Sequence, residues 1–251
     1  MVSDLVGRSA LVTGSSRGVG RGIAERLAAS GCRVAVNGRD HQAVAKVVSV
    51  LDGSVPITGD VSTPEGASTV VAEAVAVLGG LDVLVCNVGG GRSVPPGEET
   101  PDEWQRVFAL NLWSTTNTVQ AARTALAVSS GSIVCISSIC GLEAIRGAPV
   151  TYSAAKSALH AYVRGIAWPL GEDGVRINAI AVGNMLFDGS VWSKQLALEG
   201  DEVASMLKTQ VALGRFGVPN DVANLVAFLA SDRSGFATGA VWALDGGQVH
   251  S

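Results

Sequence analysis

The chain has 251 residues, which is enough for one large α/β domain with a complete core. Its net charge is −4 and it has no basic run, so the composition does not favour binding to nucleic acid or to an anionic membrane. It contains no apolar stretch of about 18 residues and no basic-then-apolar leader, and we therefore expect a cytoplasmic protein without a membrane-spanning helix.

Short β-branched runs alternate with longer helical patterns along the chain. The predicted strands are Ser9–Thr13, Arg33–Asn37, Val55–Thr58, Leu81–Cys86, Ser132–Ser137, Arg176–Ala181 and Ala240–Ala243. The predicted helices are Gly20–Ser30, His41–Leu51, Pro64–Leu78, Pro101–Val128 and Thr151–Gly171. Nearly continuous apolar strands separated by helices indicate a parallel sheet with helices on both faces. Without a linker or a repeat, the sequence predicts one doubly wound α/β domain of the Rossmann type over residues 1–251, with about seven strands.

A glycine-rich segment follows the first predicted strand directly. Thr13–Gly20 reads Thr-Gly-Ser-Ser-Arg-Gly-Val-Gly and leads into a helix. Glycines let the backbone approach a pyrophosphate closely, and a helix N-terminus supplies free N–H groups and a positive dipole end. At the first strand-to-helix junction of a βαβ pattern, this segment favours a dinucleotide site over a plain tight turn. The predicted cofactor contacts here are Gly14, Ser16, Arg17, Gly18, Val19 and Gly20.

The second predicted strand ends without an acidic residue. It continues as Asn37-Gly38-Arg39, and Asp40 comes only after the arginine. An acid at the strand end would hold the ribose 2′-OH of NAD. Arg39 and Arg17 can instead reach a 2′-phosphate, because a guanidinium matches phosphate well. The sequence thus favours NADP(H) over NAD(H), with two solvated surface arginines as the alternative.

Tyr152 and Lys156 are four positions apart in a predicted helix, so their side chains share one face. A fixed ammonium beside a phenol favours a pKa below the usual value of about 10. A phenol of that kind can exchange a proton with a carbonyl oxygen. The pair alone is a weak signal, and its weight depends on the motifs that stand upstream.

Taken in order, the motifs resemble those of the short-chain dehydrogenase/reductase family, and in particular its 3-oxoacyl-carrier-protein reductase-like members. The matching segments are Thr13–Gly20, Asp60-Val61, Asn87-Val88-Gly89, Leu110-Asn111-Leu112, Ile136–Gly141 with Ser138, Tyr152 with Lys156, Arg215–Gly217, Leu229–Asp232 and Asp245–Gly247. Each motif is modest alone, but together they cover nearly the whole chain in the family's order.

The resemblance implies hydride transfer between a nicotinamide cofactor and a small-molecule carbonyl or alcohol. Tyr152 would donate the proton in the reduction direction, and Ser138 would orient the substrate oxygen. Lys156 would hold the nicotinamide ribose and lower the pKa of the tyrosine, while Asn111 would anchor a water or simply kink its helix. Further implied cofactor contacts are Asp60, Val61, Asn87, Gly89 and Met185, besides Tyr152 and Lys156 themselves.

One departure from the family pattern follows the sixth strand. Where the family usually has Pro-Gly, this chain has Val182-Gly183. Loss of the proline predicts a looser turn and a weaker hold on the nicotinamide carboxamide, with the chemistry itself unaffected.

The connection 183–213 is unusually long for a compact domain and carries Met185, Phe187 and Trp192. We interpret it as a substrate flap, and a plain helical hairpin on the surface is a compatible alternative. Phe187 and Trp192 are candidate substrate contacts, together with Glu143 and Arg146, for which solvent-facing loop residues are the alternative. The polar pair favours a sugar-like or carboxylated substrate, whereas the apolar flap favours a 3-oxoacyl thioester.

Two further questions concern other functions and assembly. A catalytically silent dinucleotide sensor is the alternative of another class, but it would typically have lost the tyrosine or the lysine. In relatives the long fourth and fifth helices and the last strand form subunit contacts, and the resemblance therefore implies a homotetramer. Charged residues are only 16% of the chain, against roughly 25% in typical soluble domains, which also favours buried subunit contacts over a merely large core.

The cysteines and histidines predict no special chemistry. The four cysteines are Cys32, Cys86, Cys135 and Cys140; they form no Cys-x-x-Cys pair, and we expect reduced thiols. The three histidines are scattered, which predicts no metal site, and His160 is expected on a helix surface.

Overall fold

Seven strands form one sheet in the order β3-β2-β1-β4-β5-β6-β7, and each neighbouring pair is parallel. The computed structural model describes residues 4–249. The strands are β1 (Ser9–Val12), β2 (Arg33–Gly38), β3 (Ser54–Thr58), β4 (Val83–Cys86), β5 (Ser132–Ser138), β6 (Arg176–Val182) and β7 (Val241–Leu244). The predicted doubly wound parallel sheet of the Rossmann type is confirmed.

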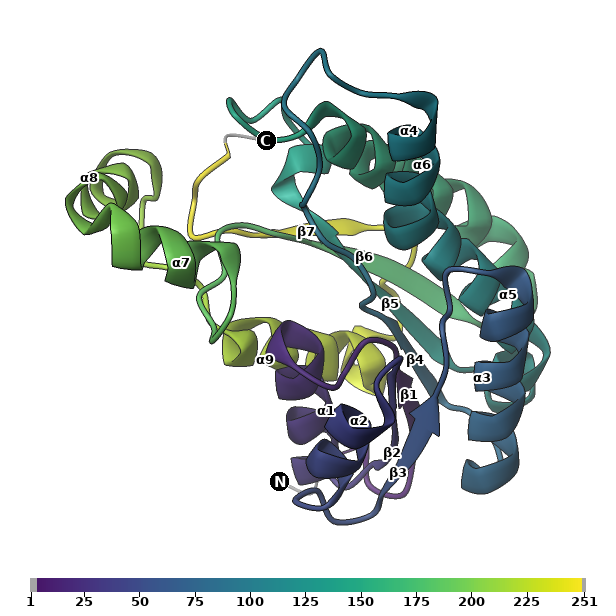
Figure 1. Ribbon diagram of the computed structural model, residues 1–251. Helices are drawn as coiled ribbons and strands as arrows, with labels where there is room; N and C mark the ends of the chain where they lie inside the picture. Colours follow the sequence, from purple (N-terminus) through teal and green to yellow (C-terminus); the bar gives the residue numbers. More distant parts are fainter. Residues whose placement is uncertain (1–3, 250–251) are drawn as a thin grey trace.

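Helices cover both faces of this sheet (Figure 1). One layer holds α1 (Gly18–Ala29), α2 (His41–Val48) and α9 (Pro219–Ala230), whose apolar side chains belong to one buried cluster. The other layer holds α3 (Pro64–Leu78), α5 (Ser114–Ser129) and α6 (Val150–Glu172), which share a second cluster. Because the sheet separates the two clusters, its strands must be apolar on both sides.

The strands supply both clusters by alternation of their side chains. In β4, Leu84 and Cys86 belong to the cluster under α3, α5 and α6, while Val83 and Val85 belong to the cluster under α1 and α9. All four residues are buried. This pattern explains why the strands read as continuous apolar runs, since each face of a doubly covered parallel sheet needs its own apolar residues.

The predicted helix Pro101–Val128 is interrupted, and in this respect the prediction of one helix is wrong. The segment consists of α4 (Pro101–Phe108), a π-helical stretch (Ala109–Trp113) and α5. Asn111 lies inside the π-helical stretch, and its Nδ2 donates to the Val107 carbonyl at 3.0 Å. A π-helical turn widens the helix locally and is frequent at functional sites. Here it directs a fully buried amide side chain toward the end of β4.

The long connection after β6 contains two helices, α7 (Val191–Leu198) and α8 (Gly200–Gln210), which project from the body of the molecule (Figure 1). Its first residues are held by an isolated parallel bridge between Met185 and Gly217. Val182 pairs with both Ser138 and Leu244 as the last residue of β6, and the looser turn after it stays a prediction. A proline there would have no N–H to offer the sheet.

Candidate active site

The glycine-rich segment Thr13–Gly20, which we call the phosphate loop, connects β1 to α1. It lies at the carboxyl end of the sheet, where the strand order reverses between β1 and β4. In doubly wound folds this switch point is the usual ligand crevice. Gly14 and Gly18 have φ angles of 61° and 56°, which favour glycine. A Cβ atom on Gly20 would collide with the Gly14 carbonyl and the Asn87 amide. The three glycines are therefore required by the backbone itself.

The N-terminus of α1 is open toward a ligand. Its N-cap residue, Arg17, makes no side-chain cap hydrogen bond, so the first N–H groups of the helix have no side-chain partner. Asn87 lies beneath the loop, where its Nδ2 donates to the Thr13 and Gly14 carbonyls, both at 3.0 Å. A rigid glycine loop ahead of a free helix N-terminus fits the pyrophosphate of a dinucleotide.

Asn37 is a second support of this loop, and the sequence reading missed it. Its Oδ1 accepts from the Gly14 N–H at 3.3 Å, and its Nδ2 donates to the Ile57 and Gly59 carbonyls at 3.2 and 3.3 Å. The side chain is buried, so its hydrogen bonds have no competition from water. The sequence signal that could have found this support is Asn37 itself, a polar residue inside the apolar run of β2.

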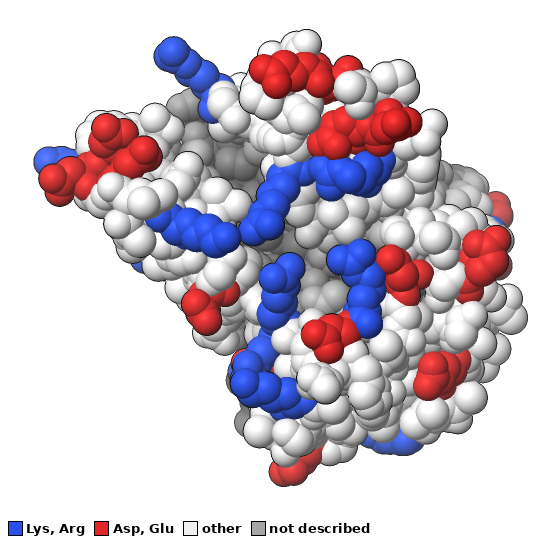
Figure 2. Space-filling view, in the orientation of Figure 1, with Lys and Arg blue, Asp and Glu red and all other residues white. Residues whose placement is uncertain are grey.

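The two arginines proposed for the 2′-phosphate are both exposed. Arg39 is 75% exposed, and its Nη1 lies 3.5 Å from Asp60 Oδ2. Partial burial opposes ionisation of Asp60, but hydrogen bonds from Ser62 and the charge of Arg39 lower its pKa overall. Figure 2 shows Lys and Arg side chains gathered around the hollow in the middle of this face, with acidic side chains mostly toward its margin. Such a field suits a ligand that carries phosphates.

Ser138 and Tyr152 are brought together from two elements, the end of β5 and the start of α6. Burial raises the pKa of Tyr152 to about 12, and a hydrogen bond with Ser138 partly opposes this rise. The sequence predicted a shift in the other direction, caused by Lys156. Desolvation of the phenol is the largest cause of the shift, so the expectation of a lowered pKa is wrong.

Lys156 lies one helical turn beyond Tyr152, with its Nζ 5.8 Å from the centre of the tyrosine ring. Nζ donates to the Ile136 carbonyl at 3.1 Å, and burial lowers the pKa of this lysine to about 8. A Cβ atom on Gly89 would lie 3.1 Å from Nζ and 2.9 Å from Asn111 Oδ1. Gly89 therefore keeps open a small space that the lysine and the asparagine share.

Asn111 bonds both backbone groups of Gly90 besides the Val107 carbonyl of its own helix. Its Oδ1 accepts from the Gly90 N–H at 2.9 Å and its Nδ2 donates to the Gly90 carbonyl at 3.1 Å. These contacts match the helix-kink role that the sequence left open. The role in anchoring a water is compatible with them and stays a prediction.

The segment from Gly89 to Ser93 is tied to two helices. Ser93 Oγ lies 2.7 Å from Glu103 Oε1 on α4 and 2.6 Å from Thr151 Oγ1 on α6. Hydrogen bonds from Arg106 and Ser93 lower the pKa of Glu103 to about 2, so its carboxylate only accepts. Ser93 thus donates to Glu103, and Thr151 donates to Ser93. We call these three residues the Ser93 clamp; it holds the glycine segment beside Tyr152.

His160 is buried, so its predicted place on the surface of a helix is wrong. Its Nε2 lies 2.7 Å from the Oγ of Ser137, the residue before Ser138. Burial lowers the pKa of His160 to about 4, and the imidazole is neutral at pH 7. Ser137 and Ser138 thus have separate partners, His160 and Tyr152.

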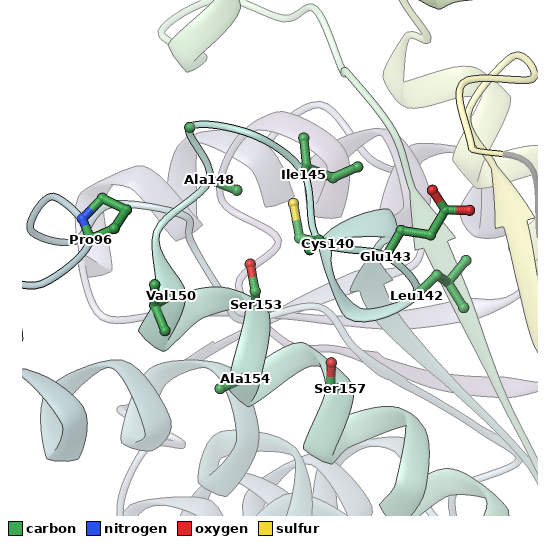
Figure 3. A pocket seen from close by; sticks show the side chains of 12 residues that line it. Pro96, Cys140, Leu142, Glu143, Ile145, Ala148, Val150, Ser153, Ala154 and Ser157 are labelled. Atoms are coloured by element: carbon green, nitrogen blue, oxygen red, sulfur yellow. The ribbon is translucent and has the colours of Figure 1, made fainter.

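The candidate substrate residues Glu143 and Arg146 lie in two adjoining hollows. Glu143 lines a hollow of about 490 Å³ between the loop that ends at Ala148 and the exposed side of α6, into which the hydroxyls of Ser153 and Ser157 point (Figure 3). Arg146 lines one of about 470 Å³ beside Lys208. Neither hollow is lined by Ser138 or Tyr152, so the structure does not bring Glu143 and Arg146 to the candidate catalytic residues.

The apolar flap residues occupy different places. A Cβ atom on Gly18 would lie 2.7 Å from Cε2 of Phe187, so this ring covers the phosphate loop. Met185 is buried with its side chain against Gly217. Trp192 packs on Phe216, with ring centres 5.3 Å apart. Phe187 is thus the flap residue nearest to the predicted cofactor.

Residues 4–249 show neither a membrane-spanning helix nor a cluster of metal-binding side chains. Within them, no helix combines the length and the apolar character needed to cross a membrane. The same residues contain no group of three or more His, Cys, Asp or Glu side chains that could hold a metal ion. Three of the cysteines are buried, and Cys140 is half-buried at the first hollow.

The fold and these residues are typical of nicotinamide-dependent oxidoreductases, and comparison with known proteins agrees. Residues 14–249 match the family model described as enoyl-(acyl carrier protein) reductase. The chain is 35% identical over 246 residues to a 3-oxoacyl-acyl-carrier-protein reductase of Staphylococcus aureus, covering 96% of this chain and 97% of that one. It is 34% identical over 251 residues to an L-rhamnose 1-dehydrogenase (NAD(P)(+)) of a Sphingomonas species, covering 97% and 96%.

A solved structure extends the comparison to three dimensions. L-sorbose reductase from Gluconobacter frateurii, in complex with NADPH and L-sorbose, superimposes with a TM-score of 0.93 and 27% identity over the full length of both chains. The chain belongs to the short-chain dehydrogenase/reductase family and is an oxidoreductase of that family.

Proposed function

We propose that the protein is an NADP(H)-dependent enzyme that reduces a carbonyl to an alcohol, or catalyses the reverse reaction. The observation that carries the proposal is the convergence of Ser138, Tyr152, Lys156 and Asn111 beside Gly89–Gly91 at the carboxyl end of β4 and β5. When bound, the dinucleotide supplies or accepts the hydride at the substrate carbon. Residues of this chain carry out all the other steps of the reaction.

The proposed cofactor site combines the phosphate loop with the arginines beside it. Gly14, Gly18 and Gly20 let the pyrophosphate approach the N–H groups of α1, and Ser16 and Val19 belong to the same turn. Arg17 and Arg39 would meet the 2′-phosphate, because both are exposed and carry the guanidinium that phosphate prefers. The remaining proposed contacts are Asp60, Val61, Asn87, Gly89, Tyr152, Lys156 and Met185.

Support for NADP(H) comes partly from relatives. The sorbose reductase was solved with NADPH, whereas the rhamnose dehydrogenase carries both NAD and NADP in its name. Since relatives of similar distance differ, the preference of this chain has to rest on its own residues. A β2 end with Arg39 and no acid is the feature that favours NADP(H).

The proton chemistry falls to Tyr152. Its buried phenol has a raised pKa and stays protonated at neutral pH, so it can donate to a carbonyl oxygen that becomes negative during reduction. Ser138 would donate a hydrogen bond to the same oxygen. The pKa of Lys156 is lowered to about 8, so its side chain can hold or release a proton near neutral pH. Lys156 would return a proton to Tyr152 through a water held near Asn111.

Two substrate classes remain in the proposal, each with its own support. A 3-oxoacyl thioester is favoured by the similarity to the acyl-carrier-protein reductase and by the apolar Phe187 and Trp192 on the flap. A sugar-like or carboxylated substrate is favoured by the rhamnose dehydrogenase and the sorbose reductase. A silent sensor is disfavoured because Tyr152 and Lys156 are both retained.

The test of this proposal is a turnover assay that uses the purified protein with NADPH or NADH. A panel of 3-oxoacyl thioesters, ketoses and 2-oxo acids is added, and the nicotinamide absorbance is followed. We expect NADPH oxidation with at least one class and a weaker rate with NADH. Tight NADPH binding without turnover across the panel would favour the sensor and contradict the proposed enzyme.

A further inference from the structure

The buried pair Ser137–His160 has no role in the proposed chemistry, yet it lies directly behind the candidate catalytic residues. Both side chains are 2% exposed, and the Oγ–Nε2 distance is 2.7 Å. Ser137 precedes Ser138 on β5, and His160 stands one turn after Lys156 on α6. The pair therefore joins the strand that carries one candidate catalytic residue to the helix that carries two others.

The surroundings of His160 make this junction tight. A Cβ atom on Gly141 would lie 2.7 Å from His160 Cε1 and 2.7 Å from the Lys156 carbonyl carbon. Ser157 Oγ donates to the Gly141 carbonyl at 3.1 Å. The turn that follows Ser138 is thus pressed against α6 over one helical turn, and His160 fills the space at its far end.

Besides the hydrogen bond between Ser138 and Tyr152, three polar contacts link the end of β5 and its turn to α6, and they differ in strength and in the groups that make them. Lys156 bonds the Ile136 carbonyl, but Lys156 is itself a proposed catalytic group. The Ser157 contact is exposed to water and therefore weak. The contact between Ser137 and His160 is buried, made by two side chains, and independent of the reacting groups.

We propose that His160 is a positioning residue: through Ser137 it fixes the distance between Ser138 on β5 and Tyr152 on α6. The proposal rests on the proposed function, because it assigns a consequence to the geometry of that site. Ser138 and Tyr152 must both donate to one substrate oxygen, so their separation has to be fixed. Loss of the contact between Ser137 and His160 would make the positions of both donors less well defined.

The neutral imidazole suits this role. Burial, Arg164 and Lys156 all disfavour the charged ring, and only the Gly141 backbone opposes them. The neutral ring forms one hydrogen bond with the Ser137 hydroxyl through Nε2. Its Nδ1 has no hydrogen-bond partner among the described residues. An apolar residue of the same size would keep the packing but leave the buried Ser137 hydroxyl unpaired.

The experiment compares four variants of the full-length protein. Ser137→Ala and His160→Leu remove the contact, and His160→Gln keeps a polar group of similar reach. Ser132→Ala is the matched control, since Ser132 is a buried serine at the other end of β5 that bonds the Leu229 carbonyl at 3.0 Å. Three quantities are measured: kcat, the Kd of NADPH, and hydrogen exchange of the segment 137–142.

We expect Ser137→Ala and His160→Leu to lower kcat about 10- to 100-fold and to change the NADPH Kd by less than about twofold. His160→Gln should recover kcat to within about threefold of the unchanged protein. Exchange over 137–142 should be faster in the first two variants and unchanged in Ser132→Ala. A kcat that stays within about twofold in His160→Leu, or a drop that Ser132→Ala shares, would overturn the proposal.

The exchange measurement separates the two possible failures. If the unchanged protein turns over no substrate, the proposed function fails, but exchange over 137–142 still reports whether His160 holds the turn. If turnover is found and exchange is equal in all four variants, the positioning role fails and the proposed function stands.

Discussion

At the scale of single residues, the site depends on groups whose burial changes their chemistry. Desolvation raises the pKa of Tyr152, so the phenol keeps its proton. The same effect lowers the pKa of Lys156, so the ammonium loses its proton more readily than usual. The sequence predicted which residues meet, but it predicted the wrong direction for the tyrosine. Spacing on a helix shows that two side chains share a face; it does not show how deeply that face is buried.

Arg39 provides the test of cofactor preference. Replacing it in Arg39→Asp removes a cation from the proposed 2′-phosphate contact and places an acid where NAD enzymes use one. We expect kcat/KM for NADPH to fall about 10-fold or more, with a gain for NADH. Steady-state rates with both cofactors measure this. A variant that still prefers NADPH would count against the assignment.

His160 predicts a pH dependence of stability. Unfolded, its imidazole binds a proton at about pH 6.5; folded, it does so only near pH 4, because its pKa is lowered to about 4. Between these values the unfolded state binds more protons, so the free energy of unfolding falls as the pH drops from about 6.5 toward 4.

Urea unfolding at a series of pH values measures this effect. The His160→Leu variant should show a shallower fall over that pH range than the unchanged protein, because it lacks the titrating ring. Equal slopes in both proteins would mean that His160 is not buried as a neutral group.

At the scale of elements, two short segments determine the shape of the site. The π-helical stretch Ala109–Trp113 turns Asn111 inward, and the Ser93 clamp holds Gly89–Gly91 beside Tyr152 and Lys156. The sequence offered a helix kink at Asn111 but did not predict the π-helical stretch itself, and it did not predict the clamp. A π-helical stretch has no clear sequence signature, and the clamp joins residues that are far apart along the chain.

The Ser93 clamp can be opened by Ser93→Ala. Loss of the hydroxyl leaves the buried Thr151 hydroxyl and the Glu103 carboxylate without their link. We expect faster hydrogen exchange over 89–93 and a kcat/KM reduced about 10-fold, as for other residues that support a site indirectly. Ser49→Ala, an exposed serine on the far end of α2, is the control. Unchanged exchange over 89–93 would show that other contacts hold this segment.

At the scale of the whole molecule, the sequence predicted the fold well because its signals are repeated. Seven apolar runs alternating with helical patterns leave few arrangements other than a doubly wound sheet. The phosphate loop could likewise be located, since glycine spacing is imposed by the backbone. The surroundings of Glu143 and Arg146 could not be predicted, because the path of the loop between Ser138 and Tyr152 depends on packing against α6; their role as substrate contacts stays a prediction.

Assembly is the prediction that belongs to this scale. Trp168 on α6 is 79% exposed, Trp113 at the end of the π-helical stretch is exposed, and β7 is an edge strand with one side unpaired. Apolar residues on long helices and an open sheet edge favour contacts with other subunits. We expect light scattering to give four times the 25.5 kDa of one chain. A monomer mass at micromolar concentration would contradict the predicted homotetramer.

The central claim is that Tyr152 supplies the proton in a carbonyl reduction, and Tyr152→Phe tests it most directly. The measurement is kcat with the best substrate of the panel, together with the Kd of NADPH for the same variant. The account predicts a loss of kcat of about 10³-fold or more with the NADPH Kd nearly unchanged, because the proton donor is lost while the other proposed cofactor contacts remain. A variant that retains kcat within about 10-fold of the unchanged protein would contradict the account.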